Sequence, residues 1–162
     1  IHNRIHKHMT SILKYAVLAL SVTLTATLQA ETNPKQSQIK TLSKAQIECL
    51  SKAAYFESKG ESDAGMLAVI HTTLNRVKDA RFPNTICGVV YQKSQYVWTK
   101  HNPKIKEKEQ YERAERLAKE VVAGKHKDVS KGALYFVHVK INRNWLEKLT
   151  YTCTIGNHKF FK

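Results

Sequence analysis

The chain has 162 residues, of which 42% are hydrophobic and 25% charged, and its formal net charge is +14. This length suits one domain with one modest core and leaves little room for a second. A positive excess of this size predicts a polyanionic partner, such as nucleic acid, an anionic membrane or a wall polymer, and three cysteines without a CxxC pair disfavour a zinc–cysteine site.

Residues 10–30 have the features of an export signal. Lys14 supplies positive charge, and the 16 residues from Tyr15 to Ala30 include no charged side chain. That stretch is short for a membrane span, which needs about 20 apolar residues. Because the small residue Ala30 precedes Glu31 as at a cleavage site, we expect residues 1–30 to act as a signal peptide, or as a signal anchor if they stay uncleaved.

The rest of the chain divides simply. Met9 is the expected true start, residues 31–42 are polar and predict a flexible leader, and residues 43–162 predict a single domain. Beyond position 30 there are 24 basic and 13 acidic residues, a net charge of +11. We expect an exported monomer in the periplasm or cell envelope, which disfavours nucleic acid as a partner and limits membrane contact to the N-terminal segment.

The first predicted helix spans residues 43–58, and its opening sequence SKAQ matches a capping box. Its apolar face, which includes Leu50 and Ala54, continues at Glu57, so a carboxylate stands where an apolar side chain is expected. Gly60 follows as a helix stop.

Three further helices and a small sheet are predicted after it. The helices are expected at residues 62–78, 84–91 and 105–123, with N-caps at Ser62 and at Asn84 or Thr85, and with Gly124 closing the last. Composition and alternation predict extended segments at residues 95–99, 133–138 and 151–161. The expected fold class is therefore α+β, helix-dominated, with a small antiparallel sheet.

Export also bears on the cysteines at positions 49, 87 and 153. An oxidising compartment permits one disulfide and leaves one thiol over. The spacing does not choose among the three pairings, which stay open.

Glu57 is the candidate for chemistry. A carboxyl group at the end of an apolar stripe, shielded by Tyr55 or Phe56, tends to stay protonated near neutral pH. A protonated carboxyl is what a general acid for glycosidic bond cleavage needs. Periodicity alone favours a snorkelling or ion-paired Glu at a helix end, which is the commoner case.

Several motifs in order extend this interpretation. They are YFESKGE at 55–61, LNRV at 74–77, RFPNTICGVVY at 81–91, QYVW at 95–98 and IGNH at 155–158, with Gly132-Ala133, Tyr135-Phe136 and Trp145 between them. Over about residues 46–162 the chain thereby resembles the cell wall hydrolases of the spore cortex-lytic enzyme (SleB) type. It departs from many relatives at His138, one position away from their His-aromatic-His segment, and at Lys100-His101, where they carry Cys-Asp.

The resemblance implies a lysozyme-like, lytic-transglycosylase-like domain that cleaves the β-1,4 bond between N-acetylmuramic acid and N-acetylglucosamine in peptidoglycan glycan strands. Glu57 corresponds to the family's catalytic glutamate, and Glu61 is a candidate second carboxylate. The candidate substrate-binding residues are Gln95, Tyr96, Trp98, Tyr135, Trp145 and His158. We expect no cofactor and no metal, since one carboxyl group serves first as acid and then as base.

Three other functions are alternatives for the same sequence. A zinc-dependent N-acetylmuramoyl-L-alanine amidase would need about three ligands, and the histidines after Met9 show no HExxH or comparable pair. A non-catalytic, cationic wall-binding module fits the composition equally well. A secreted nuclease or nucleic-acid binder is the weakest alternative, because the aromatic residues form no recognised nucleic-acid motif.

Overall fold

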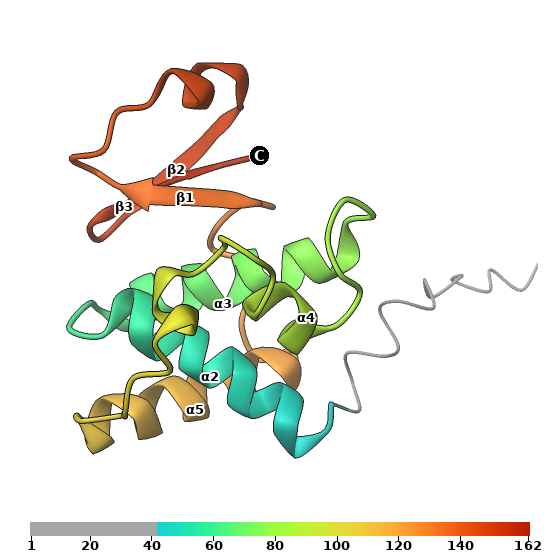
Figure 1. Ribbon diagram of the computed structural model, residues 1–162, viewed down its shortest axis with the longest axis vertical. Coiled ribbons are helices and arrows are strands. Elements are labelled where there is room, and N and C mark those ends of the chain that lie inside the picture. The colour runs from blue at the N-terminus through green and yellow to red at the C-terminus, as the bar shows by residue number, and fades with distance from the viewer. Residues whose placement is uncertain (1–41) are drawn as a thin grey trace, which may run out of the picture. The chain divides into compact units, whose positions relative to one another are not determined.

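The computed structural model describes residues 42–162 (Figure 1). Their elements are α2 (Lys44–Ser58), α3 (Asp63–Lys78), α4 (Ile86–Val90), η1 (Val97–Lys100), α5 (Lys108–Val122), β1 (Tyr135–His138), η2 (Asn144–Lys148), β2 (Tyr151–Ile155) and β3 (His158–Phe161). The predicted export signal and leader lie outside the described residues, apart from Leu42, which packs against the core. Within residues 42–162, no helix is both long and apolar enough to span a bilayer.

The first helix has the predicted ends. The Ser43 side chain accepts a hydrogen bond from the Gln46 N–H, which satisfies one of the free donors at the start of α2. The helix ends at Ser58, and Gly60 follows with φ 85°, a conformation that glycine adopts without strain. These ends place Glu57 in the last turn of α2.

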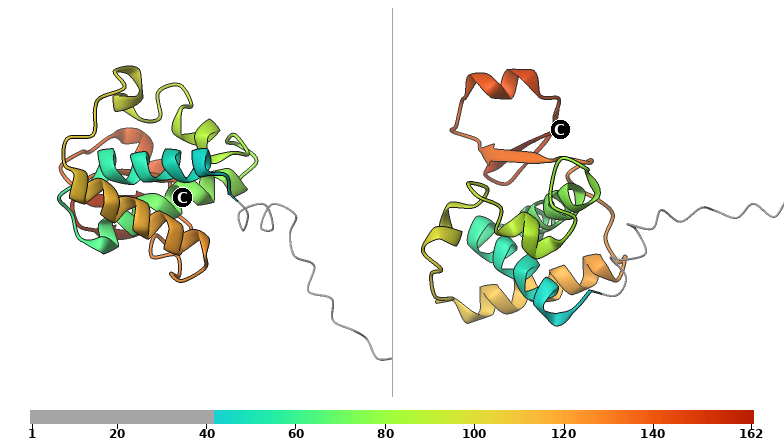
Figure 2. Two further views of the ribbon diagram at one scale, coloured as in Figure 1. Left: turned by 90° about the horizontal axis from the view of Figure 1, so that it is seen from below. Right: turned by 45° about the vertical axis from the view of Figure 1, so that its right-hand side comes forward.

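The core lies around α2, which packs against α3, α4 and α5 (Figure 1; Figure 2, left). Leu50, Ala54 and Tyr55 are fully buried there. A disulfide between Cys49 and Cys87 joins α2 to α4, and Cys153 is the free thiol, so the structure resolves the pairing that the sequence left open.

The sheet has the strand order β1-β3-β2, and both pairings are antiparallel. Phe136 and Phe160 lie opposite each other on neighbouring strands. Phe160 is buried in a cluster with Ala68 of α3, and Phe136 packs against the same cluster. The sheet therefore rests on α3 through this aromatic face, and α2 lies on the far side of α3 in Figure 1.

The structure corrects one predicted element near Glu57. Residues 95–99 do not form an extended segment, because Val97–Lys100 is a 3₁₀ turn that ends where the N–H of His101 donates to the Trp98 carbonyl. The alternation in the sequence instead reflects packing, since Tyr96 is 2% exposed and Val97 is 73% exposed.

Two boundaries also differ from the prediction. The segment at 151–161 is a hairpin of β2 and β3 that turns at Gly156. The last helix begins at Lys108, not at residue 105, because the buried Tyr55 hydroxyl accepts hydrogen bonds from the N–H groups of Lys106 and Glu107 and also donates to the Glu107 carboxylate. These bonds hold the backbone before α5 in a non-helical path.

Candidate active site

Glu57 is partly buried, and its burial raises the pKa of its carboxyl group from 4.5 to about 7. Burial penalises the charged form, whereas the Trp98 indole N–H and the positive charge of Arg76 stabilise it and hold the increase back. Glu57 is therefore close to half protonated at neutral pH, so it can both give and take a proton there.

Arg76 is a buried cation beside this carboxyl group. It is 4% exposed, its Nε donates to the Leu134 carbonyl at 2.6 Å, and no carboxylate among the described residues forms an ion pair with it. Sequence reasoning did not assign Arg76 a role. The available signal was a basic residue between Leu74 and Val77 near the end of the predicted helix, within LNRV.

Trp98 is the aromatic residue next to the Glu57 carboxyl group. Its ring lies 4.6 Å from the ring of Phe56, the residue that precedes Glu57, and 6.2 Å from the ring of Tyr91. Trp98 is only partly buried, so a part of its ring remains available to a ligand. Its indole N–H is shielded from solvent and makes no hydrogen bond of regular geometry within residues 42–162, which leaves the Glu57 carboxyl as the group it acts on.

Tyr96 does not fit the predicted role as a sugar-stacking surface. It is buried, its hydroxyl lies 3.1 Å from the Thr73 hydroxyl, and its ring stacks on Trp98 at 6.2 Å. Burial raises the pKa of the Tyr96 hydroxyl, so it stays neutral. Tyr96 therefore packs against the Trp98 ring from the side of the core. Gln95, the preceding residue, is partly exposed.

Tyr135 and Trp145 form a second aromatic group. Their rings lie 6.1 Å apart, and Tyr135 also lies 6.0 Å from Phe82. Trp145 is 46% exposed. Successive residues of a strand face opposite sides, so Tyr135 points away from the face of β1 that carries Phe136. The predicted aromatic residues therefore divide into one group at Glu57 and one on the outer side of the sheet.

Glu61 and His158 connect the start of α3 to the sheet. Glu61 Oε1 lies 3.0 Å from His158 Nδ1, and the Glu61 side chain is 8% exposed. Burial lowers the pKa of His158, and His138 lowers it further, while Glu61 acts in the opposite direction. His138 faces His158 across the strands with ring centroids 6.1 Å apart.

The position of Glu61 bears on its predicted role as a second carboxylate. Its charge is not among the causes that shift the pKa of Glu57, which are burial, Trp98 and Arg76. Glu61 and His158 therefore form a separate, mostly buried pair.

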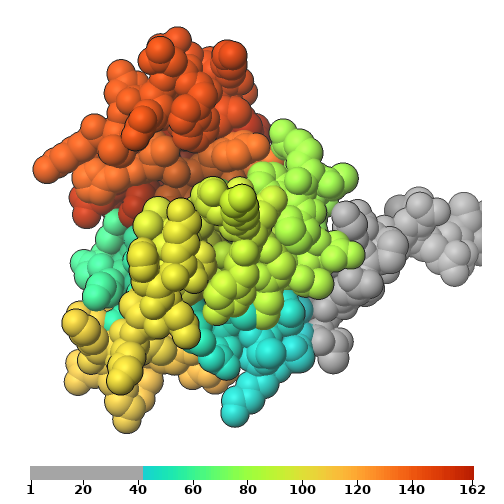
Figure 3. Space-filling model, viewed as in Figure 1, coloured from blue at the N-terminus to red at the C-terminus, as the bar shows by residue number. Residues whose placement is uncertain are grey.

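On the face drawn in Figure 3, the yellow segment around η1 borders the orange sheet, and the Tyr96 and Phe136 rings, 6.3 Å apart, join these two parts.

Comparisons with known proteins agree with this arrangement. The sequence profile described as Cell Wall Hydrolase matches residues 60–161, a range that begins three residues after Glu57. The catalytic domain of the Bacillus cereus SleB protein is 28% identical with a TM-score of 0.65, covering 75% of this chain and 93% of that chain. The catalytic domain of the germination-specific lytic transglycosylase SleB from Bacillus anthracis is 28% identical with a TM-score of 0.64, covering 75% and 97%.

Two curated relatives give the same family from sequence. The spore cortex-lytic enzyme of Bacillus cereus is 46% identical over 46 residues, which are 28% of this chain and 18% of the relative. That of Oceanobacillus iheyensis is 32% identical over 68 residues, which are 38% of this chain and 25% of the relative. The matches thus span a quarter or less of the relatives' length. The predicted helix-dominated α+β fold is confirmed as that of SleB catalytic domains, and the chain belongs to the cell wall hydrolase family.

Proposed function

We propose that this chain is a peptidoglycan-cleaving enzyme that acts as a lytic transglycosylase on the β-1,4 bond between N-acetylmuramic acid and N-acetylglucosamine. The observation that carries the proposal is the pKa of Glu57, which burial raises to about 7 beside a partly exposed tryptophan. A surface Glu at a helix end would have no such shift. The family and the SleB-like fold support a glycan strand as substrate.

In the proposed reaction, the neutral Glu57 donates its proton to the glycosidic oxygen that leaves. Positive charge then develops on the sugar as an oxocarbenium-like transition state. The resulting Glu57 carboxylate takes the proton from the sugar's own 6-hydroxyl, and this oxygen bonds to the anomeric carbon. An anhydro sugar results, and Glu57 regains its proton without consuming water.

The other residues around Glu57 have supporting roles in this proposal. The exposed part of Trp98 packs against the apolar face of a sugar ring. Gln95 offers its amide to an N-acetyl group. Tyr135 and Trp145 contact the glycan strand at a point farther from Glu57, on the outer side of the sheet. Glu61 and His158 hold the sheet against α3 and take no part in proton transfer.

The test is the variant Glu57→Gln, with Glu48→Gln as its matched control. Both residues lie on α2, but Glu48 is exposed and forms an ion pair with Lys52. We expect the first variant to fold, to bind walls and to release no soluble fragments, while the second keeps its activity. Full release by Glu57→Gln would contradict the proposal, and a wild type that binds walls without releasing fragments would favour the non-catalytic wall-binding module.

Mass spectrometry of the fragments separates the related reactions. Anhydro ends support transglycosylation, reducing ends indicate hydrolysis, and free stem peptides indicate an amidase. Activity that EDTA removes and zinc restores would also favour the amidase. No group of three or more His, Cys, Asp or Glu is arranged to hold a metal ion between residues 42 and 162, which gives the amidase no support. We further propose that the enzyme acts as a monomer in the periplasm or cell envelope, which gel filtration and cell fractionation test.

A further inference from the structure

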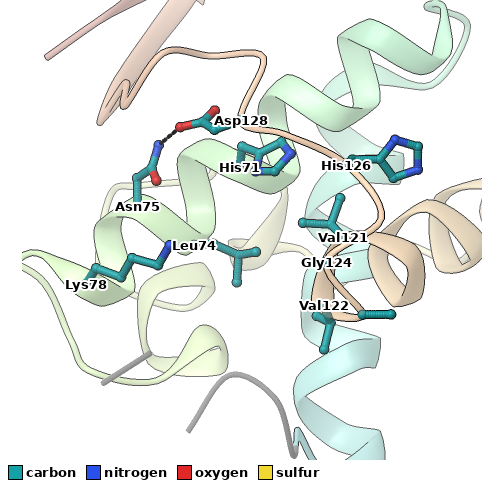
Figure 4. A pocket seen from close by; sticks show the side chains of 10 residues that line it. His71, Leu74, Asn75, Lys78, Val121, Val122, Gly124, His126 and Asp128 are labelled. Carbon is teal, nitrogen blue, oxygen red and sulfur yellow. Dashed lines mark hydrogen bonds between the residues drawn. The ribbon is translucent and has the colours of Figure 1, made fainter. Parts of the chain in front are cut away.

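A cavity of about 480 Å³ lies between α3 and the C-terminal end of α5, and none of the residues discussed for the active site lines it. Figure 4 shows His71, Leu74 and Lys78 along α3 on one side and Val121 and Val122 of α5 on the other. A volume of this size is in the range of small-ligand sites and accommodates two small amino-acid residues. The cavity combines an apolar wall with polar groups at two places.

His71 supplies a buried ring nitrogen that has no protein partner. The residue is 7% exposed, and its Nε2 makes no hydrogen bond within the described part of the chain. In the neutral ring one nitrogen carries the proton, and a ligand N–H is matched by the tautomer that carries it on Nδ1 and leaves the lone pair on Nε2. Burial lowers the pKa of His71 and keeps this ring neutral. A buried polar atom without a partner is costly, so a ligand group that hydrogen-bonds to Nε2 is favoured here.

Lys78 supplies a positive charge to the same cavity. It is exposed, and no ion pair involves it within residues 42–162. The acidic residue of the cavity, Asp128, is already used, because it accepts hydrogen bonds from Asn75, Ser130 and the Gly132 N–H. Lys78 is therefore the group in the cavity that remains free for an anion.

These three features specify one kind of ligand. The cavity offers His71 Nε2 to an amide N–H, Lys78 to a carboxylate, and Leu74, Val121 and Val122 to small apolar side chains. We propose that the cavity binds the carboxylate end of a peptide with small apolar side chains, which is the chemistry of free stem-peptide ends in peptidoglycan. The identification with stem peptides rests on the proposed function, whereas the chemistry of the cavity does not.

The experiment is a titration of the full chain with N-acetyl-D-alanyl-D-alanine, followed by calorimetry and by backbone amide shifts in NMR. We expect shifts around His71, Lys78 and Val121. Lys78→Ala should weaken binding about tenfold or more, because a charge-assisted hydrogen bond is lost. Lys140→Ala, which removes an exposed charge in the turn after β1, should change the affinity less than about twofold.

Three further results decide the proposal. The same dipeptide with an amidated C-terminus should bind as weakly to the wild type as the acid does to Lys78→Ala. His71→Phe, checked for folding by circular dichroism, should weaken both peptides; if it unfolds, the Lys78 variant and the amidated peptide decide. No binding at millimolar concentration, equal binding of acetate, or shifts centred on Trp98 would overturn it. Glycan cleavage plays no part in this titration, so its outcome is independent of that of Glu57→Gln.

Discussion

The raised pKa of Glu57 makes a prediction about stability as well as catalysis. The folded chain holds the Glu57 proton up to about pH 7, whereas the unfolded chain releases it near 4.5. Between these values the folded state binds more protons than the unfolded state, so the free energy of unfolding falls as pH rises. The stabilisation is fully present below pH 4.5 and is lost as pH passes 7.

The size of this effect follows from the shift. A difference from 4.5 to about 7 at roughly 1.4 kcal/mol per pKa unit corresponds to about 3 kcal/mol. In Glu57→Gln the buried group is neutral at every pH, so this cost disappears. At pH 8.5 the variant should therefore be more stable than the wild type by up to about 3 kcal/mol, and near pH 4.5 the two should be nearly equal.

Urea unfolding, followed by circular dichroism between pH 4.5 and 8.5 with the disulfide intact, measures this difference. The control is Glu147→Gln, because Glu147 is exposed on η2 and its substitution should change the free energy of unfolding by less than about 0.5 kcal/mol. If Glu57→Gln and the wild type differ by the same amount at pH 4.5 and at pH 8.5, burial does not raise the Glu57 pKa, and the central argument for a general acid fails.

Three more predictions concern the groups around Glu57 and α2. Trp98→Phe removes an N–H that favours the Glu57 carboxylate, so the pKa of Glu57 should rise further and the alkaline limb of the activity profile should move to higher pH. Replacing Cys49 and Cys87 by Ser opens a loop with a sequence separation of 38, which should lower the free energy of unfolding by about 4 kcal/mol in urea titrations. Tyr55→Phe leaves two backbone N–H groups before α5 without their acceptor and should cost about 1–3 kcal/mol in the same assay.

Each of these variants has a matched control that should leave the measured quantity unchanged. They are Trp145→Phe for the pH profile, Cys153→Ser for the disulfide and Tyr151→Phe for the buried hydroxyl. An alkaline limb that stays in place in Trp98→Phe would show that the indole N–H does not act on Glu57. Disulfide or Tyr55 variants as stable as their controls would show that the core around α2 does not depend on these links.

The helices were predictable because their signals are local. The capping sequence at residues 43–46 and the apolar face of α2 depend on near neighbours in the chain, and the sequence therefore also indicated the placement of Glu57 in the last helical turn. The family resemblance, which depends on motifs in order, was confirmed by the matching profile and the SleB structures.

What the sequence did not predict depends on contacts between distant segments. Tyr96 and Trp98 alternate with their neighbours as in a strand, but Val97–Lys100 is a 3₁₀ turn and Tyr96 enters the core. Arg76 lies in the LNRV motif, yet its nearness to Glu57 arises only when α2 and α3 pack together. The choice of Cys87 over Cys153 likewise depends on the packing of α4 against α2.

The surroundings of Glu61 restrict how this protein can vary. A Cβ atom at Gly65 or at Gly156 would overlap with the Glu61 side chain, although these glycines are far apart in the chain. Substitution at either one must displace Glu61 and its partner His158, and at Gly156 the φ of 54° also strains any other residue. Libraries for directed evolution should therefore keep both glycines, because no shorter side chain at Glu61 removes the Cβ overlap at Gly65 or the backbone strain at Gly156.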